Sequence, residues 1–437
     1  MVEWALDQSP LEPDVEPLLL SLVELGNEVQ VMIDYRYTDG AQLAVTISLE
    51  KSTDPSGGTW NALPPPSPDL PVNGIVSVSV VDAERFDFVN GTGPLKMYYR
   101  LRISGTDNGQ AFAYTSPMVG YHRLRCLAGS DTHSGLMFRQ RSVHRADCPG
   151  APLPAATAGQ WTVSYAAQPA SLAPGQTVRF ESGVLAGQAF LVTAVNAGGF
   201  DVAGDLSSVA SGDRYRVAPS WTTATLLSMA GTVIEDSTNY LGLNRGNEIL
   251  HFDQRGNGFN RSATAVLYHL PTTGWRSTVS VTALEDGHLL DSDGAFVVRG
   301  AGPQVTADAW LVMAGAEVET SIVTTIGAGG SDTVIALQRA VPVKLRDAAL
   351  FSSGAFEGSA DTQPVNRRDE LMICDNAVIG LNKQPSAIFY YDLSSGLWRS
   401  TTAPASDAGD VELAPGAFLK IRSASGGSTT WTLPATP

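Results

Sequence analysis

The chain has 437 residues, of which 43% are hydrophobic and 16% are charged, and its formal net charge at pH 7 is −16. A chain of this length is expected to form roughly two to four domains with buried cores. The acidic balance argues against nucleic-acid binding, which needs clustered Lys and Arg to contact phosphates, and against binding to an anionic membrane surface.

The first segment, residues 1–26, is acidic and is predicted to form an N-terminal arm, with a short helix or an extended stretch over Leu11–Leu25. No basic stretch followed by a long apolar run opens it, so we expect no secretory signal peptide. The apolar run Leu18–Leu25 is far shorter than the roughly 20 residues of a membrane-spanning helix. We therefore expect no membrane insertion.

Residues 27–118 alternate apolar and polar side chains, as in VQVMIDYRY and IVSVSVV, with Gly, Asn and Pro between the runs. Alternation with period two is typical of strands that bury one face, and Gly and Asn supply the backbone conformations of tight turns. About six or seven such strands predict a sandwich of the immunoglobulin or fibronectin type.

A second β segment covers residues 149–225, where a linker rich in Pro and Ala precedes short runs such as QTVRFES and DRYRVAP. These runs show no helical periodicity. We expect a small β-barrel, inserted into a first β unit made of residues 119–148 and 226–318.

The rest of the chain contains an internal repeat. NRGNEILHFDQRGNGFNRSATAVLYH begins at Asn244 and NRRDELMICDNAVIGLNKQPSAIFYY at Asn366, an offset of 122 residues. Self-similarity of this kind indicates related structural units, so we expect a second β unit over residues 319–437. The matching residues include Glu248 and Glu370, Asp253 and Asp375, Gly258 and Gly380, Asn260 and Asn382, Trp275 and Trp398, and Trp310 and Trp431.

The tetrapeptide Gly-Ser-Asp-Thr occurs once in each unit, before an apolar run. In the first copy Ser130, Asp131 and His133 are the residue types of a hydrolase triad. Adjacent strand residues point to opposite faces, however, and Val334 replaces the histidine in the second copy. We interpret the motif as a repeated turn, in which Asp131 and Asp332 accept backbone N–H groups.

Metal and disulfide sites are not predicted. The acidic stretches Asp253–Gly258 and Glu285–Gly294 lack the alternating acids and closing Glu of an EF-hand, so we interpret them as hairpin turns. No C-x-x-C or H-E-x-x-H motif is present. The cysteines are expected to be reduced thiols, although Cys126 and Cys148 could form a disulfide in an exported chain. They are Cys126, Cys148 and Cys374, and the scattered histidines are His122, His133, His144, His251, His269 and His288.

The repeated acids and tryptophans have two readings each. Glu248 and Glu370 could form a glycosidase pair, but equivalent places in separate units should keep them apart. We expect each to form an ion pair with a repeated arginine, Arg276 or Arg399. The repeated tryptophans could stack on sugars, but their recurrence favours core packing. No catalytic, cofactor-binding or metal-binding residue is predicted.

Several segments resemble an uncharacterised all-β family best represented in Verrucomicrobia-type bacteria, over roughly Val119–Pro437. They include GSDT, RFESGVLAGQAFLVTA, DELMICDNAVIGLNKQPSAIFYY and GLWRS. The N-terminal part, with LEKSTDPSGGTWNAL and YYRLRIS, resembles sandwich modules in the same kind of proteins. The resemblance implies an all-β fold and an exported context, and it transfers no activity, cofactor or site residue.

These patterns predict an all-β, multi-domain chain that is not an enzyme and needs no cofactor. We expect a structural subunit of a large assembly, such as a phage-type virion or tail component or a surface appendage. A weakly charged β surface suits packing against copies of itself and other structural proteins. Its location would be a virion or an extracellular assembly. The alternative is a cell-surface or virion adhesin that binds polysaccharide through aromatic side chains.

Overall fold

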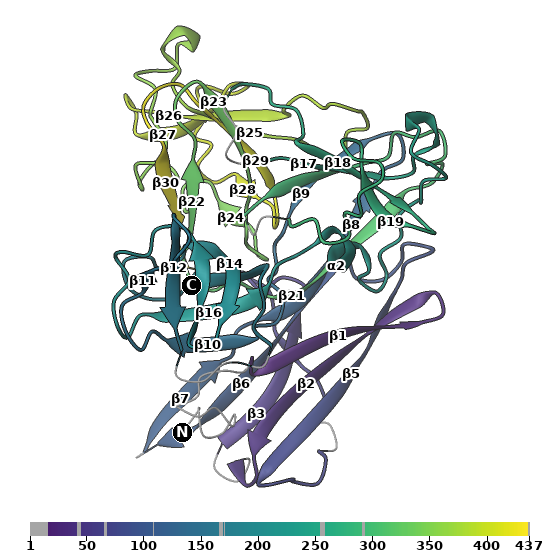
Figure 1. Cartoon of the computed structure of the whole chain (residues 1–437), viewed down its shortest axis with the longest axis vertical. Coiled ribbons are helices and arrows are strands. Elements are labelled where there is room, and N and C mark those ends of the chain that lie inside the picture. Colours follow the sequence, from purple (N-terminus) through teal and green to yellow (C-terminus); the bar gives the residue numbers. More distant parts are fainter. Residues whose placement is uncertain are drawn as a thin grey trace.

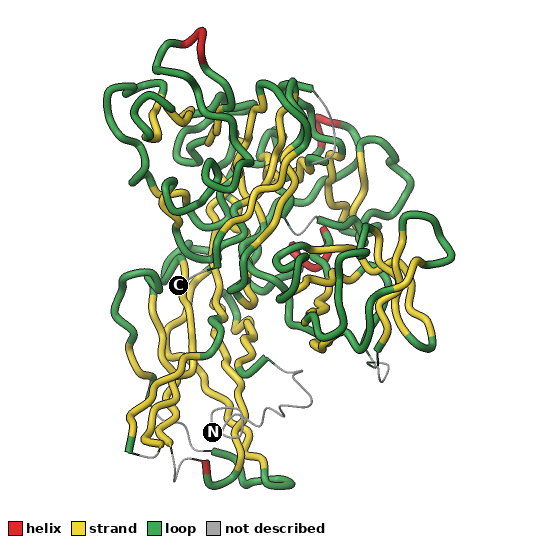
Figure 2. Tube along the Cα trace, turned by 90° about the vertical axis from the view of Figure 1, so that its left-hand side faces the viewer, coloured by secondary structure: helices red, strands yellow, loops and turns green. Residues whose placement is uncertain are grey.

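Strands account for nearly all the regular structure. The computed structural model describes residues 16–41, 45–64, 68–107, 109–165, 169, 171–253, 258–290 and 293–435. Within these ranges the strands form seven sheets, and the one α-helix is the short α2 (Thr223–Leu227). Figures 1 and 2 show strands throughout the molecule with long connecting loops between them. The all-β prediction is confirmed.

Two sheets pack face to face at the N-terminal end. Strands β1 (Leu18–Leu25), β2 (Glu28–Thr38) and β5 (Ile75–Asp87) form the first sheet, and every second residue of β2 is buried. One apolar core joins this sheet to the second, which is six-stranded. The second sheet contains β3 (Val45–Ser52), β4 (Asn61–Ala62), β6 (Lys96–Asp107), β7 (Gln110–Thr115), β8 (Val119–Cys126) and β21 (Ala309–Ala316).

The N-terminal sheets extend beyond the range expected for the sandwich. β1 lies in the predicted arm, where it is a strand paired with β2 rather than a helix. β8 pairs with β6, and β21 pairs with β8. Both strands come from residues predicted to belong to the first β unit. Pairing covers sheet edges that would otherwise carry open N–H and C=O groups, so the sheet crosses the predicted boundary at residue 119.

A seven-stranded sheet curves into a half-barrel around its own apolar core, in which Phe180, Phe200 and Tyr215 are fully buried. Its strand order is β10-β16-β13-β14-β15-β12-β11. The strands are β10 (His144–Asp147), β11 (Leu153–Pro154), β12 (Gln160–Ser164), β13 (Gln176–Phe180), β14 (Ala189–Asn196), β15 (Gly199–Ala203) and β16 (Arg214–Pro219).

Two five-stranded sheets have the same strand order, β9-β20-β17-β18-β19 and β23-β29-β25-β26-β27. The sequence repeat therefore corresponds to two topologically equivalent sheets. The first is made of β9 (Asp131–Gly135), β17 (Glu248–His251), β18 (Ala265–Leu270), β19 (Gly274–Ser277) and β20 (Ala295–Arg299). The second is made of β23 (Ser331–Ala336), β25 (Glu370–Ile373), β26 (Ala387–Asp392), β27 (Leu397–Ser400) and β29 (Phe418–Ser423).

A further pair of strands accompanies each five-stranded sheet. β8 and β21 flank the first repeat in sequence, and β22 (Ile322–Ile326) and β30 (Thr429–Leu433) flank the second. The remaining two-stranded sheet joins β24 (Val343–Lys344) to β28 (Glu412–Leu413). The two five-stranded sheets share an apolar contact in which Leu250 and Val297 of the first lie with Val334 and Phe418 of the second.

Candidate functional site

The Gly-Ser-Asp-Thr motif of the first unit begins strand β9 and is held by an ion pair. Asp131 lies opposite Arg299 of β20, whose guanidinium donates two hydrogen bonds to the carboxylate, of 2.7 and 2.8 Å. The backbone N–H of Asn382, in the second unit, donates to the same carboxylate at 2.6 Å. Arg299 also donates to the Asn382 side-chain oxygen. The carboxylate is therefore saturated by structural partners.

The second copy of the motif makes the same contacts in the opposite direction. Arg422 of β29 donates to both oxygens of Asp332, at 2.8 and 3.1 Å, and the backbone N–H of Asn260 in the first unit donates at 2.6 Å. Burial alone would raise the pKa of Asp332, but the hydrogen bonds from Arg422 and Asn260 hold it below its ordinary value. We call these two sets of contacts the reciprocal clasps: Asp131 with Arg299 and Asn382, and Asp332 with Arg422 and Asn260.

No hydrolase triad forms around the motif. Ser130 Oγ donates to the carbonyl oxygen of Gly380 and accepts the N–H of the same residue. The backbone of His133 exchanges two hydrogen bonds with the Asn376 side chain. Its ring lies edge-on to Phe418 with centroids 4.9 Å apart. Asp131 and Asp332 accept backbone N–H groups, as expected, but they lie in strands β9 and β23 and their donors come from the other unit, so the interpretation as a local turn is wrong.

The repeated glutamates form ion pairs with nearer arginines than expected. Glu248 pairs with Arg245 at 2.5 Å and Glu370 with Arg367 at 3.7 Å, each three residues away. The expected partners were Arg276 and Arg399, which bond elsewhere: Arg276 donates to the carbonyl oxygen of Trp275, and Arg399 lies 3.5 Å from Asp392. That expectation was wrong because each glutamate instead pairs with the arginine three residues before it in the chain.

The repeated tryptophans are mostly core residues. Trp275, Trp398 and Trp431 are 4%, 5% and 2% exposed, which leaves no ring face open for stacking on a ligand. Trp310 is half-buried, and the guanidinium of Arg123 lies 4.6 Å from its ring centroid. Core packing, expected from their recurrence, holds for the three buried rings.

The cysteines and acidic turns supply no metal or redox site in the described residues. Cys126 and Cys148 are free and lie in different apolar clusters, and burial raises the pKa of both thiols to about 12. Cys374 is also free. Across the described ranges no group of three or more His, Cys, Asp or Glu could hold a metal ion. Residues 254–257 and 291–292 of the two acidic turns lie outside those ranges.

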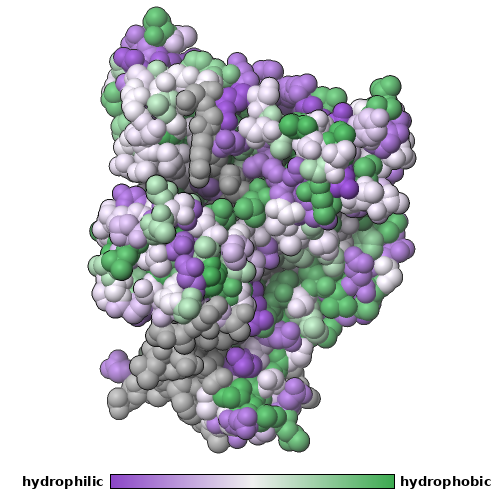
Figure 3. Space-filling model, in the orientation of Figure 1, coloured by the Kyte–Doolittle hydropathy of each residue, from purple (hydrophilic) through white to green (hydrophobic). Residues whose placement is uncertain are grey.

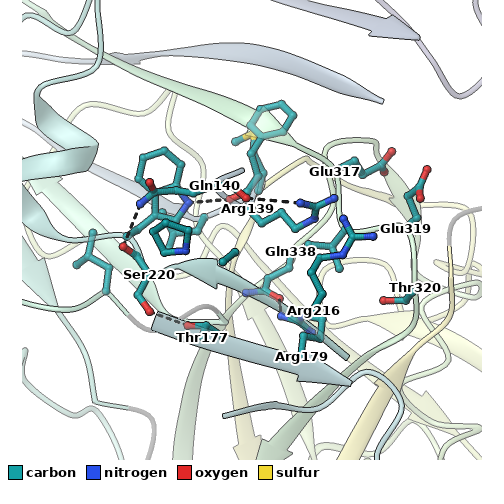
Figure 4. A pocket seen from close by; sticks show the side chains of 18 of the residues that line it. Arg139, Gln140, Thr177, Arg179, Arg216, Ser220, Glu317, Glu319, Thr320 and Gln338 are labelled. Atoms are coloured by element: carbon teal, nitrogen blue, oxygen red, sulfur yellow. Dashed lines mark hydrogen bonds between the residues drawn. The ribbon is translucent and has the colours of Figure 1, made fainter. Parts of the chain in front are cut away.

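A cavity of about 70 Å³, lined by both apolar and charged side chains, lies where the half-barrel meets both β units (Figure 4). Its walls come from the segment after β9, from β13 and β16, and from the connection between β21 and β22. Pockets for small-molecule ligands have volumes of about 300–1,000 Å³, so this cavity has room for a few water molecules only. The charged and amide side chains around it are Arg139, Arg179, Arg216, Glu317, Glu319 and Gln338.

A chain of ion pairs runs along this cavity. Glu16 accepts hydrogen bonds from Arg139 and from Arg216, the latter at 2.7 Å. Arg216 also donates to Glu181 at 2.6 Å, and Glu181 accepts from Arg145 at 2.8 Å. Burial would raise the pKa of Glu16, but the two guanidinium groups hold it far below the ordinary value. These ion pairs connect the N-terminal segment, the first unit and the half-barrel.

The remaining charged groups at the cavity also bond to backbone and side-chain atoms of the protein. Arg179 donates to the carbonyl oxygen of Gly187 at 2.7 Å and to Gln338 at 2.9 Å, and burial lowers its pKa to about 10. Burial raises the pKa of Glu319, against the attraction of the arginines beside it. Among the described residues that line the cavity, the hydroxyls of Thr177 and Ser220 bond to each other at 2.7 Å, with no basic side chain bonded to either. We find no nucleophile with a base among these lining residues.

Sequence reasoning missed the cavity entirely. Glu16 and Arg216 are 200 residues apart, and no spacing or motif marks either as the partner of the other. No family model matches this sequence, and no curated protein matches it either. In the described part of the chain, no helix is both long and apolar enough to span a bilayer.

Proposed function

We propose that the chain is a non-enzymatic structural subunit that packs against copies of itself and against other structural proteins in a larger assembly. The observation that carries this proposal is an exposed apolar residue at the same place in both units. Leu243, on the turn η2 (Gly242–Asn244), is 78% exposed, and Val365, on η3 (Pro364–Asn366), is 88% exposed. The repeat offset of 122 residues relates the two positions.

The turn that carries each exposed residue is held in place by the arginine that follows it. Arg245 follows η2, pairs with Glu248, and lies 5.5 Å from the ring centroid of Tyr268. In the second unit Arg367 makes the same contacts with Glu370 and Tyr390, the latter at 5.2 Å. An apolar side chain presented on a fixed support loses little conformational freedom when it binds. Two equivalent points on one chain would let it bridge two neighbours.

We expect other subunits to contact this surface at separate points, such as η2 and η3. Hydrophilic and hydrophobic residues are interspersed over the face shown in Figure 3, and η3 projects at the top of Figure 2. The ion pairs at the cavity and the reciprocal clasps connect segments that are far apart in sequence. A subunit that bears mechanical load benefits from such cross-connection.

We further infer how the chain is divided. An immunoglobulin- or fibronectin-like sandwich precedes two related β units, and the half-barrel is inserted into the first. The equal strand order of the two five-stranded sheets supports this division, as does the resemblance to the all-β bacterial family. A virion or an extracellular assembly is the location that fits a structural subunit of this kind.

Light scattering after size exclusion, over a range of concentrations, tests the proposal. The wild-type chain is expected to form multimers, and the double variant Leu243→Ser, Val365→Ser is expected to lose mass. Val72→Ser is a matched control, because Val72 is 69% exposed and lies on the N-terminal part of the chain. A wild-type chain that stays monomeric throughout would contradict self-assembly. A double variant with unchanged mass would show that the two turns are not the contacts.

A further inference from the structure

A shallow groove of about 260 Å³ lies on the second unit beside the buried ring of Trp398. The first unit has a groove of about 490 Å³ at the equivalent place, beside Trp275. In each, the loop after the tryptophan returns to it: the N–H of Ala408 donates to Trp398 O, and the N–H of Glu285 donates to Trp275 O. The duplication thus produced two grooves that can be compared residue by residue.

The second-unit groove has an aromatic wall. The rings of Phe351 and Tyr391 are stacked, with centroids 3.6 Å apart and planes at 12°. Tyr391 also meets the edge of Trp398, with centroids 5.5 Å apart. Its hydroxyl donates to the carbonyl oxygen of Gly396 at 2.9 Å, which fixes the ring. Phe351 and Tyr391 are half-buried and line the groove, so this wall is pre-formed and reachable.

Arg346 and Asp407 also line the groove and form its charged rim, and Lys344 and Asp410 bond beside them. Arg346 donates to Asp407 at 3.3 Å and to Asp410 at 2.7 Å, and Lys344 donates to Asp410 at 3.2 Å. Arg346 is 47% exposed and Asp410 is 66% exposed, so these groups can also bond to a ligand. One cation, Arg346, and one anion, Asp407, give the groove lining no net charge. The complementary ligand is therefore neutral, with hydroxyl groups that can both donate to carboxylates and accept from a guanidinium.

We propose that the second-unit groove binds a neutral saccharide. The apolar face of a pyranose ring would lie against the aromatic wall, and its hydroxyls would bond to Arg346 and Asp407 at the rim. The groove volume of about 260 Å³ lies just below the usual range of ligand pockets and suits a single sugar residue. This activity goes beyond the structural role proposed above and does not depend on it, since the groove lies apart from η2 and η3 in sequence and is lined by other residues.

The first-unit groove differs in the residues that this argument uses. His269 occupies the place of Tyr391, and it bonds to Asp236 at 2.6 Å. Ala224 takes the place of Arg346. This groove therefore lacks the stacked wall and the guanidinium. It provides an internal control for saccharide binding.

The test is titration of the full-length chain, by calorimetry and ligand-observed NMR, with neutral oligosaccharides of glucose, mannose, galactose or N-acetylglucosamine. At least one is expected to bind, and Tyr391→Ala is expected to weaken that binding about tenfold through loss of the stacked ring. Arg346→Ala changes a side chain that is 47% exposed and pairs with two aspartates near the surface, and it is expected to weaken binding several-fold. His269→Ala, in the first unit, is expected to leave the affinity unchanged.

Three results would overturn the proposal. The first is no binding of any of these sugars at about 10 mM, which corresponds to a free energy too small for specific recognition. The second is unchanged affinity in both Tyr391→Ala and Arg346→Ala. The third is loss of binding in His269→Ala, which would place the site in the first unit. Melting curves of each variant separate loss of binding from loss of fold, and Arg346→Ala remains informative if Tyr391→Ala unfolds.

Discussion

The carboxylate of Asp131 accepts the backbone N–H of Asn382 at 2.6 Å, although 251 residues separate the two in sequence. The same contact joins Asn260 to Asp332 in the opposite direction. The two units thus exchange loops around an approximate two-fold relationship, as subunits of a symmetric dimer exchange contacts. The reciprocal clasps explain why the repeat kept both aspartates and both asparagines.

Removal of one clasp carboxylate should destabilise the chain strongly. Asp131→Ala leaves the largely buried guanidinium of Arg299 without its bidentate partner, and we expect the free energy of unfolding to fall by about 3 kcal/mol. Urea denaturation measures this change. Glu28→Ala is the control, because Glu28 and its partner Arg85 are 47% and 42% exposed, and we expect a loss below about 1 kcal/mol there. Equal losses in the two variants would contradict the structural role of the clasp.

Asn382 should tolerate glycine better than a branched residue. Its φ of 51° lies in the left-handed region, where Asn and Gly are favoured. Asn382→Gly loses only the side-chain oxygen that accepts from Arg299, while Asn382→Val adds backbone strain of about 1–2 kcal/mol. We expect Asn382→Val to melt at a lower temperature than Asn382→Gly in calorimetry. The reverse order would show that the backbone is not held in this conformation.

The repeat was visible in the sequence because both copies keep residue types and spacing from Glu248 and Glu370 onward. That the aspartates of Gly-Ser-Asp-Thr accept backbone N–H groups could be predicted, but their place in strands β9 and β23 could not. Nor could the partners of these aspartates, because Asn260 and Asn382 reach across from the other unit, and no local pattern records such a contact. Ion pairs between residues 200 positions apart, such as Glu16 with Arg216, are invisible for the same physical reason.

Strand pairing between distant segments was missed on similar grounds. Alternation does not say which edge a strand joins, so the pairing of β8 with β6 and of β21 with β8 could not be predicted from it. Leu18–Leu25 was open between a helix and an extended arm because a short apolar run lacks a clear period. The decisive factor was tertiary: Leu18 is buried in the sandwich core, which a strand paired with β2 achieves.

Acid should weaken the chain partly through Glu16. Its pKa in the folded chain is held far below the ordinary value of 4.5, so the stabilisation is complete above that value and is lost as pH falls below it. Glu16→Gln removes this term, and its free energy of unfolding should depend less on pH between about pH 5 and pH 3. The difference in slope should approach 1.4 kcal/mol per pH unit for about one proton. Parallel curves for the wild type and the variant would contradict a charged Glu16 at the cavity.

His133 should lower stability in mild acid, and its replacement by Val should remove that loss. Burial lowers the pKa of this ring from 6.5 to about 4 in the folded chain, so the unfolded chain takes up a proton first as pH falls. Stability is therefore complete above about pH 6.5 and declines between pH 6.5 and pH 4. Val334 occupies the equivalent position of β23, and Nδ1 of His133 is buried without a hydrogen bond. His133→Val should thus be tolerated at pH 7.

Denaturation at a series of pH values checks this expectation. Between pH 6.5 and pH 4 the wild type should lose up to about 3 kcal/mol more than His133→Val, for a pKa shift of this size. His144→Val is the control, since its ring lies in the half-barrel and bonds to the hydroxyl of Tyr215 at 3.2 Å. A variant that loses stability in acid as steeply as the wild type would show that His133 is protonated within the fold. The packing against Phe418 would then have to accommodate a charged ring.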